Sequence, residues 1–303
     1  MTDAAPPHAL LRPRVALPFL TISLIWGSTW FVIIGQIEGV PPAWSVAWRF
    51  VLATAGMFAL AMATGNALGM PKRAHLLALF VGLCQFCGNY MLVYQAELHL
   101  TSGIVAVMVG LMIVPNAVFG RLLLGQPITP RFALGSAIAI GGIALLLLNE
   151  ARESRLGGDV ALGIWLALGA MFAASISNVI QAGETGRRVP LMTLIAWSML
   201  YGTVIDLTVA AATAGPPVLP ADRQYWLGTA YLAFAGSVVT FPLYYGLIRE
   251  IGAGRSAYHN VLVVIVAMLL STLLEGYRWS VLAAAGSALA LLGLVVALRA
   301  KSV

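Results

Sequence analysis

The sequence contains few charged residues. Lys, Arg, Asp and Glu make up 9% of its 303 residues, whereas soluble domains carry roughly 25%. Hydrophobic residues make up 60%, and the mean hydropathy is +0.93. These values exclude a soluble globular protein and predict a chain embedded in a lipid bilayer. The formal net charge of +6 does not indicate a nucleic-acid partner, because little aqueous surface is left to carry a basic patch.

Motifs of pumps and of redox enzymes are also scarce. The chain has no glycine-rich phosphate-binding loop that ends in Lys-Ser or Lys-Thr, so ATP-driven pumping is not expected. Its two cysteines, Cys84 and Cys87, form a C-x-x-C pair inside an apolar run, where packing explains them better than redox or metal chemistry. We therefore predict no cofactor, no metal site and no enzymatic activity.

Ten apolar runs fill almost the whole chain, each close to the ~20 residues that cross the hydrocarbon layer. The runs are continuous rather than alternating, which favours helices over a membrane β-barrel. The expected fold class is an all-α integral membrane protein with ten transmembrane helices. The predicted spans are 15–35, 44–64, 75–96, 101–121, 131–149, 160–182, 190–213, 225–248, 256–274 and 279–298.

The sequence repeats itself at a nearly constant offset. The glycine-rich segment 135–142 reappears as 286–293, an offset of 151 residues, and Tyr90 falls on Phe241 at the same offset. We therefore predict two units, residues 1–152 and 153–303. Each unit holds five spans, an odd number, so the second unit is expected to be inverted in the membrane. Inverted repeats are typical of secondary transporters, with the substrate site between them.

The positive charges predict the orientation of the chain. Cytoplasmic loops carry the excess of Lys and Arg, so the richer set of loops, together with both termini, is expected in the cytoplasm. That set holds Arg12, Arg14, Lys72, Arg73, Arg121, Arg131, Arg187, Arg188, Arg249, Arg255, Arg299 and Lys301. The opposite set holds only Arg152, Arg155, Arg223 and Arg278.

Short motifs add a family resemblance. Leu24–Thr29 (LIWGST), Trp48–Phe50 (WRF), the Gly125-Gln126 turn and the Leu274–Gly276 turn (LEG) resemble the drug/metabolite transporter superfamily. Within it, the chain is similar to the ten-helix EamA-type branch, which includes bacterial exporters of amino acids. The resemblance implies a protein of the bacterial inner membrane. It also implies a central cavity lined by the first, third and fourth helices of each half.

Those six spans carry most of the polar and aromatic side chains. Trp26 and Trp30 are four residues apart and share a helical face, as do Tyr90 and Tyr94. The amide side chains of Asn89 and Asn178 lie within apolar spans. Amides avoid lipid, so these two indicate a site lined by protein or filled with water. Helix packing and aromatic belts at the membrane surface are the alternative explanation for single aromatics. The candidate substrate-binding residues are Trp26, Trp30, Asn89, Tyr90, Tyr94, Met108, Met112, Phe172, Asn178, Tyr244, Tyr258 and His259.

The intramembrane charges suggest how transport is driven. Arg49 and Asp206 are expected at similar depth, where they form an ion pair or are satisfied separately rather than serve transport. The six cavity spans have no Asp or Glu in their central portions, which argues for a facilitator without proton coupling. Pro115 is expected to loosen the fourth span.

The predicted function is export of aromatic and other neutral amino acids by alternating access. A neutral chamber with aromatic, methionine and amide side chains suits small zwitterions with apolar groups. A broad drug/metabolite efflux antiporter is the first alternative. An intramembrane protease and a non-transporting scaffold are weaker ones, since Ser28 with His259 is only an arithmetic possibility and Asp206 has no second deep carboxylate. The partners expected are small metabolites and lipid, and a monomer is compatible with the sequence.

Overall fold

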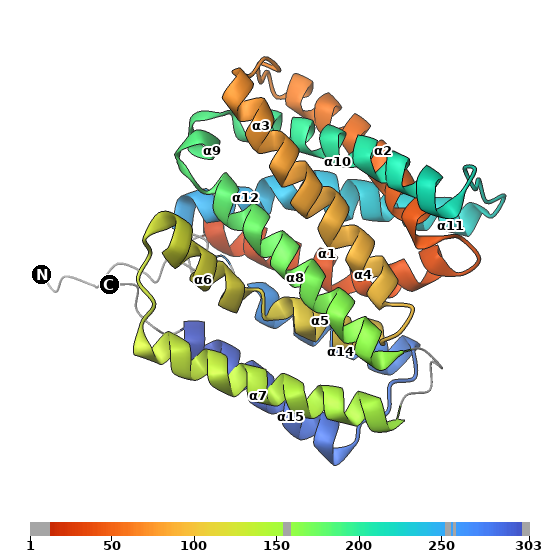
Figure 1. The fold of residues 1–303 in the computed structure, drawn as a ribbon, viewed down its shortest axis with the longest axis vertical. Helices are drawn as coiled ribbons and strands as arrows, with labels where there is room; N and C mark the ends of the chain where they lie inside the picture. Colours follow the sequence, from red (N-terminus) through yellow and green to blue (C-terminus); the bar gives the residue numbers. More distant parts are fainter. Residues whose placement is uncertain (1–12, 154–158, 252–255, 257–258, 299–303) are drawn as a thin grey trace, which may run out of the picture.

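The computed structural model describes residues 13–153, 159–251, 256 and 259–298. Within these ranges the regular structure is helical (Figure 1). The first half contains α1 (Pro13–Ile37), α2 (Pro42–Ala63), α3 (Lys72–Val81), η2 (Gly82–Asn89), α4 (Tyr90–Ala96), α5 (Ser102–Gly110), α6 (Ile113–Leu124) and α7 (Pro130–Glu153). The second contains α8 (Val160–Gln181), α9 (Glu184–Arg188), α10 (Leu191–Ala214), α11 (Arg223–Ala233), η3 (Phe234–Val239), α12 (Thr240–Ile251), α14 (His259–Leu274) and α15 (Val281–Leu298).

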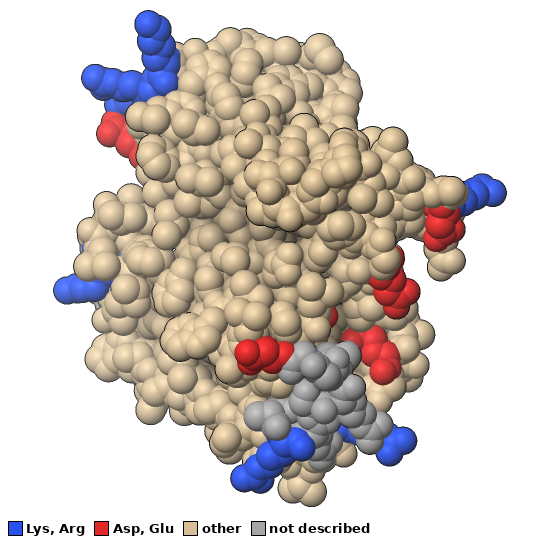
Figure 2. All heavy atoms as spheres, turned by 45° about the vertical axis from the view of Figure 1, so that its right-hand side comes forward, with Lys and Arg blue, Asp and Glu red and all other residues tan. Residues whose placement is uncertain are grey.

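The ten predicted spans are all present among the described residues. Eight segments are long and apolar enough to cross a membrane, and the shorter apolar helices 259–274 and 281–293 complete the set. The consecutive segments α3, η2 and α4 form one span, and so do α11, η3 and α12. The face drawn in Figure 2 carries its charged side chains mainly near the margins, with a broad uncharged area between them. The prediction of an all-helical membrane protein is confirmed.

The repeated glycine motif is the contact between the last helices of the two halves. A Cβ on Gly142 of α7 would lie 2.3 Å from the backbone nitrogen of Ala290 in α15. A Cβ on Gly293 would lie 2.2 Å from the nitrogen of Ala139. Both partners are related by the 151-residue offset, and the pairing runs antiparallel. The two helices therefore meet through the same surface on each side, as inverted copies should. They lie side by side at the bottom of Figure 1.

A second repeat-related contact lies between α2 and α10. The hydroxyls of Thr54 and Thr203 are 2.8 Å apart, and these residues are 149 positions apart in the chain. This offset also relates Trp48 to Trp197. Equivalent residues that touch each other mark the local two-fold axis between the halves.

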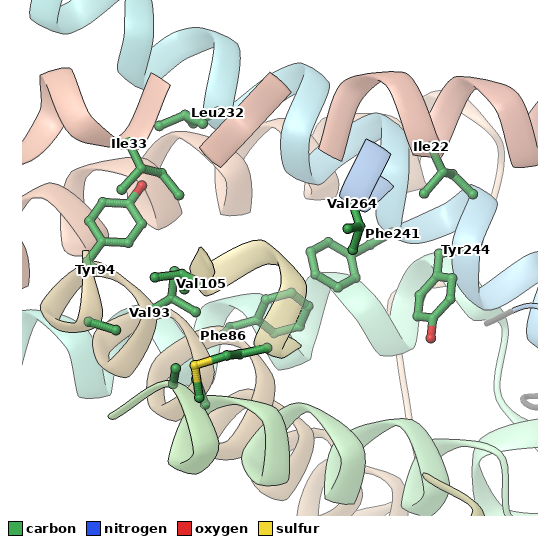
Figure 3. Packing of buried hydrophobic residues seen from close by; sticks show 14 of the residues in the cluster. Ile22, Ile33, Phe86, Val93, Tyr94, Val105, Leu232, Phe241, Tyr244 and Val264 are labelled. Atoms are coloured by element: carbon green, nitrogen blue, oxygen red, sulfur yellow. The ribbon is translucent and has the colours of Figure 1, made fainter. Parts of the chain in front are cut away.

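The third span of each half contains a π-helical segment. In the first half it is η2, and the 151-residue offset places η2 over η3 almost residue for residue. Phe86 of η2 packs edge-on against Phe241, at the start of α12, with ring centroids 4.9 Å apart (Figure 3). Short π segments widen a helix and frequently occur at functional sites. η2 packs on α8 and α10 of the second half, and η3 packs on α1 and α2 of the first half, so each π segment lies against the opposite half.

The fourth span of the first half is broken. α5 ends at Gly110 and α6 begins at Ile113. Pro115 has no N–H to donate to the carbonyl of Leu111, four residues earlier. The carbonyl instead accepts the N–H of Val114, with N and O 2.8 Å apart. The break therefore lies where the sequence predicts a loosened helix.

Successive spans alternate in direction, so one end of the bundle collects the ends of α1, α4 and α14. We call it the Glu275 end, after the residue that follows α14. There α5 begins and packs on α14: a Cβ on Gly103 would lie 2.7 Å from the sulfur of Met268. After the break, α6 packs mainly against α8.

Candidate functional site

A small cavity lies between the two halves, with a volume of about 80 Å³. One water molecule needs roughly 10–15 Å³ of such space, so the cavity has room for a few waters. A larger molecule would fit only if the surrounding helices moved apart. The lining residues come from all six spans that the resemblance implies as cavity walls, and those of the eighth span lie in α12. They are Trp26, Thr29, Trp30, Ile33, Gln85, Asn89, Tyr90, Val93, Ala106, Val109, Gly110, Met112, Ala174, Asn178, Phe241, Tyr244, Asn260 and Val263.

Aromatic rings form one wall of this cavity. The indole of Trp26 packs edge-on against Phe241 and Tyr244, with ring centroids 5.5 and 5.1 Å away. Its Nε1 donates to the carbonyl of Gly236 in η3, at 3.1 Å. The π segment thus supplies a carbonyl that fixes a cavity-lining ring from the opposite half.

Amide side chains interrupt the apolar lining. Asn89 accepts a hydrogen bond from Gln85 at 3.3 Å and donates from Nδ2 to the carbonyl of Ala170 at 2.9 Å. The Nδ2 of Asn178 donates to the sulfur of Met112 at 3.4 Å. These bonds hold both amides at the cavity rather than toward lipid.

Four polar atoms of the lining residues have no hydrogen-bond partner within the described part of the chain. They are Nε1 of Trp30, Oδ1 of Asn178, the hydroxyl of Tyr244 and Nδ2 of Asn260. Two of them are donors, one is an acceptor, and the hydroxyl can be either. A buried polar group without a partner costs about 1–3 kcal/mol.

His259 lies directly behind the aromatic wall and does not line the cavity. Its ring is 5.3 Å from that of Trp26 and 4.9 Å from that of Tyr244. Nδ1 donates to the carbonyl of Ser256 at 2.8 Å, which leaves Nε2 without a partner among the described residues. In this geometry the His259 ring packs behind the cavity wall and is held by its hydrogen bond to Ser256.

The remaining sequence candidates lie elsewhere. Tyr94 is fully buried and accepts a hydrogen bond from Arg49. Met108 and Phe172 line a separate, wholly apolar groove of about 430 Å³ between α5, α6, α7 and α8. Phe172 is 46% exposed there, as expected for a lipid-facing ring. Tyr258 lies outside the described residues.

Sequence reasoning left several lining residues out of the candidate list, with Thr29 and Phe241 the most prominent. A signal for Phe241 was available, because the repeat offset pairs it with Tyr90. Nothing in the sequence marks Thr29 as a lining residue. In the structure its hydroxyl donates to the carbonyl of Trp26 at 2.8 Å.

The sequence predicts either an ion pair or separate satisfaction for Arg49 and Asp206, and the structure shows no ion pair between them. The Arg49 guanidinium donates to Ser237 Oγ at 3.2 Å and to the Tyr94 hydroxyl at 3.3 Å, and lies 4.3 Å from the ring centre of Tyr90. Asp206 lies near the thiol of Cys87 without meeting hydrogen-bond geometry. The two side chains do not meet, because α2 presents Arg49 toward η3 whereas α10 presents Asp206 toward η2.

Comparison with known proteins gives one family. The model of the EamA-like transporter family matches residues 14–148 and again residues 161–299. The inner membrane transporter YedA of Escherichia coli, itself described as uncharacterized, is 31% identical over 276 residues, covering 88% of this chain and 86% of the relative. PagO of Salmonella typhimurium is 24% identical, with 94% and 91% covered.

Two further matches are informative. An Escherichia coli protein described as a probable amino-acid metabolite efflux pump is 26% identical over 291 residues, covering 91% of this chain and 92% of its own. One crystal structure shares the fold with a TM-score of 0.66 at 21% identity, over 93% of this chain and 95% of that chain.

Proposed function

This chain belongs to the EamA-like transporter family, and on that basis we propose that it exports aromatic and other neutral amino acids by alternating access. It is a multi-pass secondary transporter of the inner membrane and not an enzyme. The resemblance to the drug/metabolite transporter superfamily is confirmed. The cargo, the driving force and the orientation are parts of the proposal.

The observation that carries the proposed cargo is the chemistry of the central cavity. Its lining holds aromatic rings, aliphatic side chains and amides, and none of the lining residues is charged. Donor and acceptor atoms without partners, on Trp30 and Asn178, suit the carboxylate and ammonium of a zwitterion. The rings of Trp26, Phe241 and Tyr244 suit its apolar side chain. The efflux-pump description of the Escherichia coli relative supports the same cargo class.

The proposed driving force is the gradient of the cargo itself. A proton antiporter needs a carboxylate that alternates between proton and substrate, and the residues that line the cavity include none. A facilitator of this kind exports whatever metabolism accumulates inside. The excess of Lys and Arg in one set of loops supports cytoplasmic termini. The same orientation directs the Glu275 end to the periplasm. We keep the division into units 1–152 and 153–303 as part of this proposal.

Counterflow in proteoliposomes tests the proposal. Vesicles preloaded with unlabelled phenylalanine should accumulate labelled phenylalanine, tryptophan and leucine, but neither lysine nor an organic cation. Tyr244→Phe removes one hydrogen-bonding group and should raise the substrate concentration at half-maximal counterflow by roughly 3- to 10-fold. Trp165→Phe, at a side chain 72% exposed, is the matched control and should change nothing.

Three results would reject the proposal in part or as a whole. Accumulation of cations in place of amino acids would favour the drug efflux alternative. Uphill uptake driven by an imposed pH gradient would refute the facilitator. Absence of any flux from folded protein would leave a scaffold as the remaining explanation.

A further inference from the structure

Two acidic side chains lie at the Glu275 end, outside the central cavity. Glu97 directly follows the last residue of α4, and Glu275 directly follows α14. Glu275 accepts hydrogen bonds from the hydroxyl of Ser102, at the start of α5, and from Ser271 Oγ at 3.1 Å. Glu275 therefore ties the second half to the first half where α5 packs on α14.

Glu97 is buried beside this contact without a hydrogen bond. Its side chain is only 6% exposed, and neither carboxyl oxygen has a partner within the described residues. An ionised carboxylate in such a place lacks both water and a donor, which is costly. A protonated carboxyl avoids most of that cost.

The charged neighbours of Glu97 act in both directions. Burial and the charge of Glu275 raise the pKa of Glu97 well above its usual range, and Arg49 of α2 opposes this shift. Tyr94, on its own helix, also interacts with Glu97. The titratable side chains of η2 are the thiols of Cys84 and Cys87.

The element α8, which packs on α4, contributes no deep charge. Asp159 at its start is exposed and accepts the backbone N–H of Leu162. His99 accepts the backbone N–H of Asp159 at 3.2 Å. Glu275 is thus the acidic group that acts on Glu97 in this packing.

We propose that Glu97 and Glu275 form a proton-binding site that keeps the Glu275 end closed, so that external pH controls how readily the transporter opens outward. The inference rests on the proposed function for the direction of export and for the orientation. The ligand is a proton taken from periplasmic water, and it forms an O–H bond on a carboxyl oxygen of Glu97.

The direction of the pH effect follows from linkage. In the closed state Glu97 is buried and holds its proton; when α5 and α14 separate, water hydrates both carboxyls and the proton leaves. The closed state binds the proton more tightly, so acid outside favours closure. As pH rises from the ordinary range of a glutamate toward the raised pKa of Glu97, opening becomes up to about tenfold easier per pH unit.

This site does not turn the facilitator into an antiporter. The proton enters from and returns to the same side, because Glu97 lies beyond the end of its span and does not line the cavity. External pH should therefore change the rate of export without driving uphill transport.

Infrared difference spectroscopy on the purified full-length protein tests proton binding without any transport. The spectrum should show a protonated-carboxyl band that Glu97→Gln removes, while Asp206→Asn and the exposed Glu38→Gln leave it in place. Glu275→Gln removes the neighbouring charge and should move the titration of that band to lower pH. A spectrum in which Glu97→Gln removes no such band overturns the proposal, whether or not the protein transports amino acids.

Efflux from proteoliposomes at varied external pH tests the consequence. Wild-type protein and Glu38→Gln should export faster as the external pH rises, whereas Glu97→Gln should stay slow at every pH, because its neutral amide mimics the protonated state. An unchanged pH profile in Glu97→Gln overturns the control of opening. If Glu97→Gln does not fold, Glu275→Gln takes its place. A pH profile of export that is the same in Glu275→Gln as in the wild type then overturns the control of opening. Complete lack of wild-type flux rejects the proposed function, and the infrared band then decides the proton site alone.

Discussion

The fourth spans of the two halves differ, although the halves share their π-helical segments and their glycine contact. In the first half the span breaks between α5 and α6, near Pro115. In the second half the equivalent α14 runs without a break from His259 to Leu274. The repeat offset places Val266 where the first half has Pro115. One residue type thus accounts for a helix that is broken in one copy and continuous in the other.

The features that both halves share concern the frame and the cavity wall. The π segments η2 and η3 occupy equivalent positions, and the glycine contact between α7 and α15 uses equivalent residues on both sides. The break interrupts the fourth span of the first half only. We infer that α5 can move relative to α6 while α14 moves as a rigid rod.

Introducing a break into α14 should have the largest effect. Val266→Pro removes an N–H donor, forces the ring against the carbonyl of Leu262, and disturbs the close packing of Val266 on Gly27. The expected loss is about 3 kcal/mol or more of unfolding free energy. Thermal unfolding in detergent measures it, with Val266→Ala as the control that loses packing alone. Equal stability of the two variants would show that α14 tolerates the break of its counterpart.

Filling the glycine contact should have a smaller and symmetric effect. Gly142→Val and Gly293→Val each push a side chain into the facing backbone, at equivalent places. Overpacking of this kind costs about 1–3 kcal/mol, and the two losses should agree. Gly141→Val is the matched control, because nothing lies within 4 Å of a Cβ there. Clearly unequal losses would mean that α7 and α15 do not share the contact equally.

The fold could be predicted largely from the sequence because lipid imposes one rule on every span. Continuous apolar runs of about 20 residues leave a helix as the natural solution, and the ends of α2 and α10 lie close to those predicted. The π segments could not be predicted. Gly82–Asn89 contains no proline, and its two glycines do not by themselves predict a widened helix. The geometry of this segment also depends on its partners in the opposite half, α8 and α10.

The site was predictable in part. The structure places Trp26, Trp30, Asn89 and Asn178 along the cavity, and their role in binding substrate stays a prediction. An aromatic ring on a lipid-facing surface looks the same in sequence, which is why Phe172 was included although it lines the outer groove. The burial of Glu97 could not be predicted, because the residue directly follows the end of its span and the sequence of that span does not show what covers it.

Repairing the break in the first half should have the smallest effect on stability and a clear effect on transport. Pro115→Ala restores an N–H that can donate to the carbonyl of Leu111, so α5 and α6 can join into one helix. The unfolding free energy should change by less than about 1 kcal/mol. The hydrogen bond gained stabilises the folded protein, whereas loss of the proline makes the unfolded chain more flexible and so favours unfolding. Counterflow should slow several-fold, since the hinge between α5 and α6 is stiffened. Pro130→Ala is the control, because this exposed proline is the first residue of α7, where its ring is tolerated. Wild-type counterflow in Pro115→Ala would show that the broken helix is not needed for movement, and the difference between the two halves would then be one of shape alone.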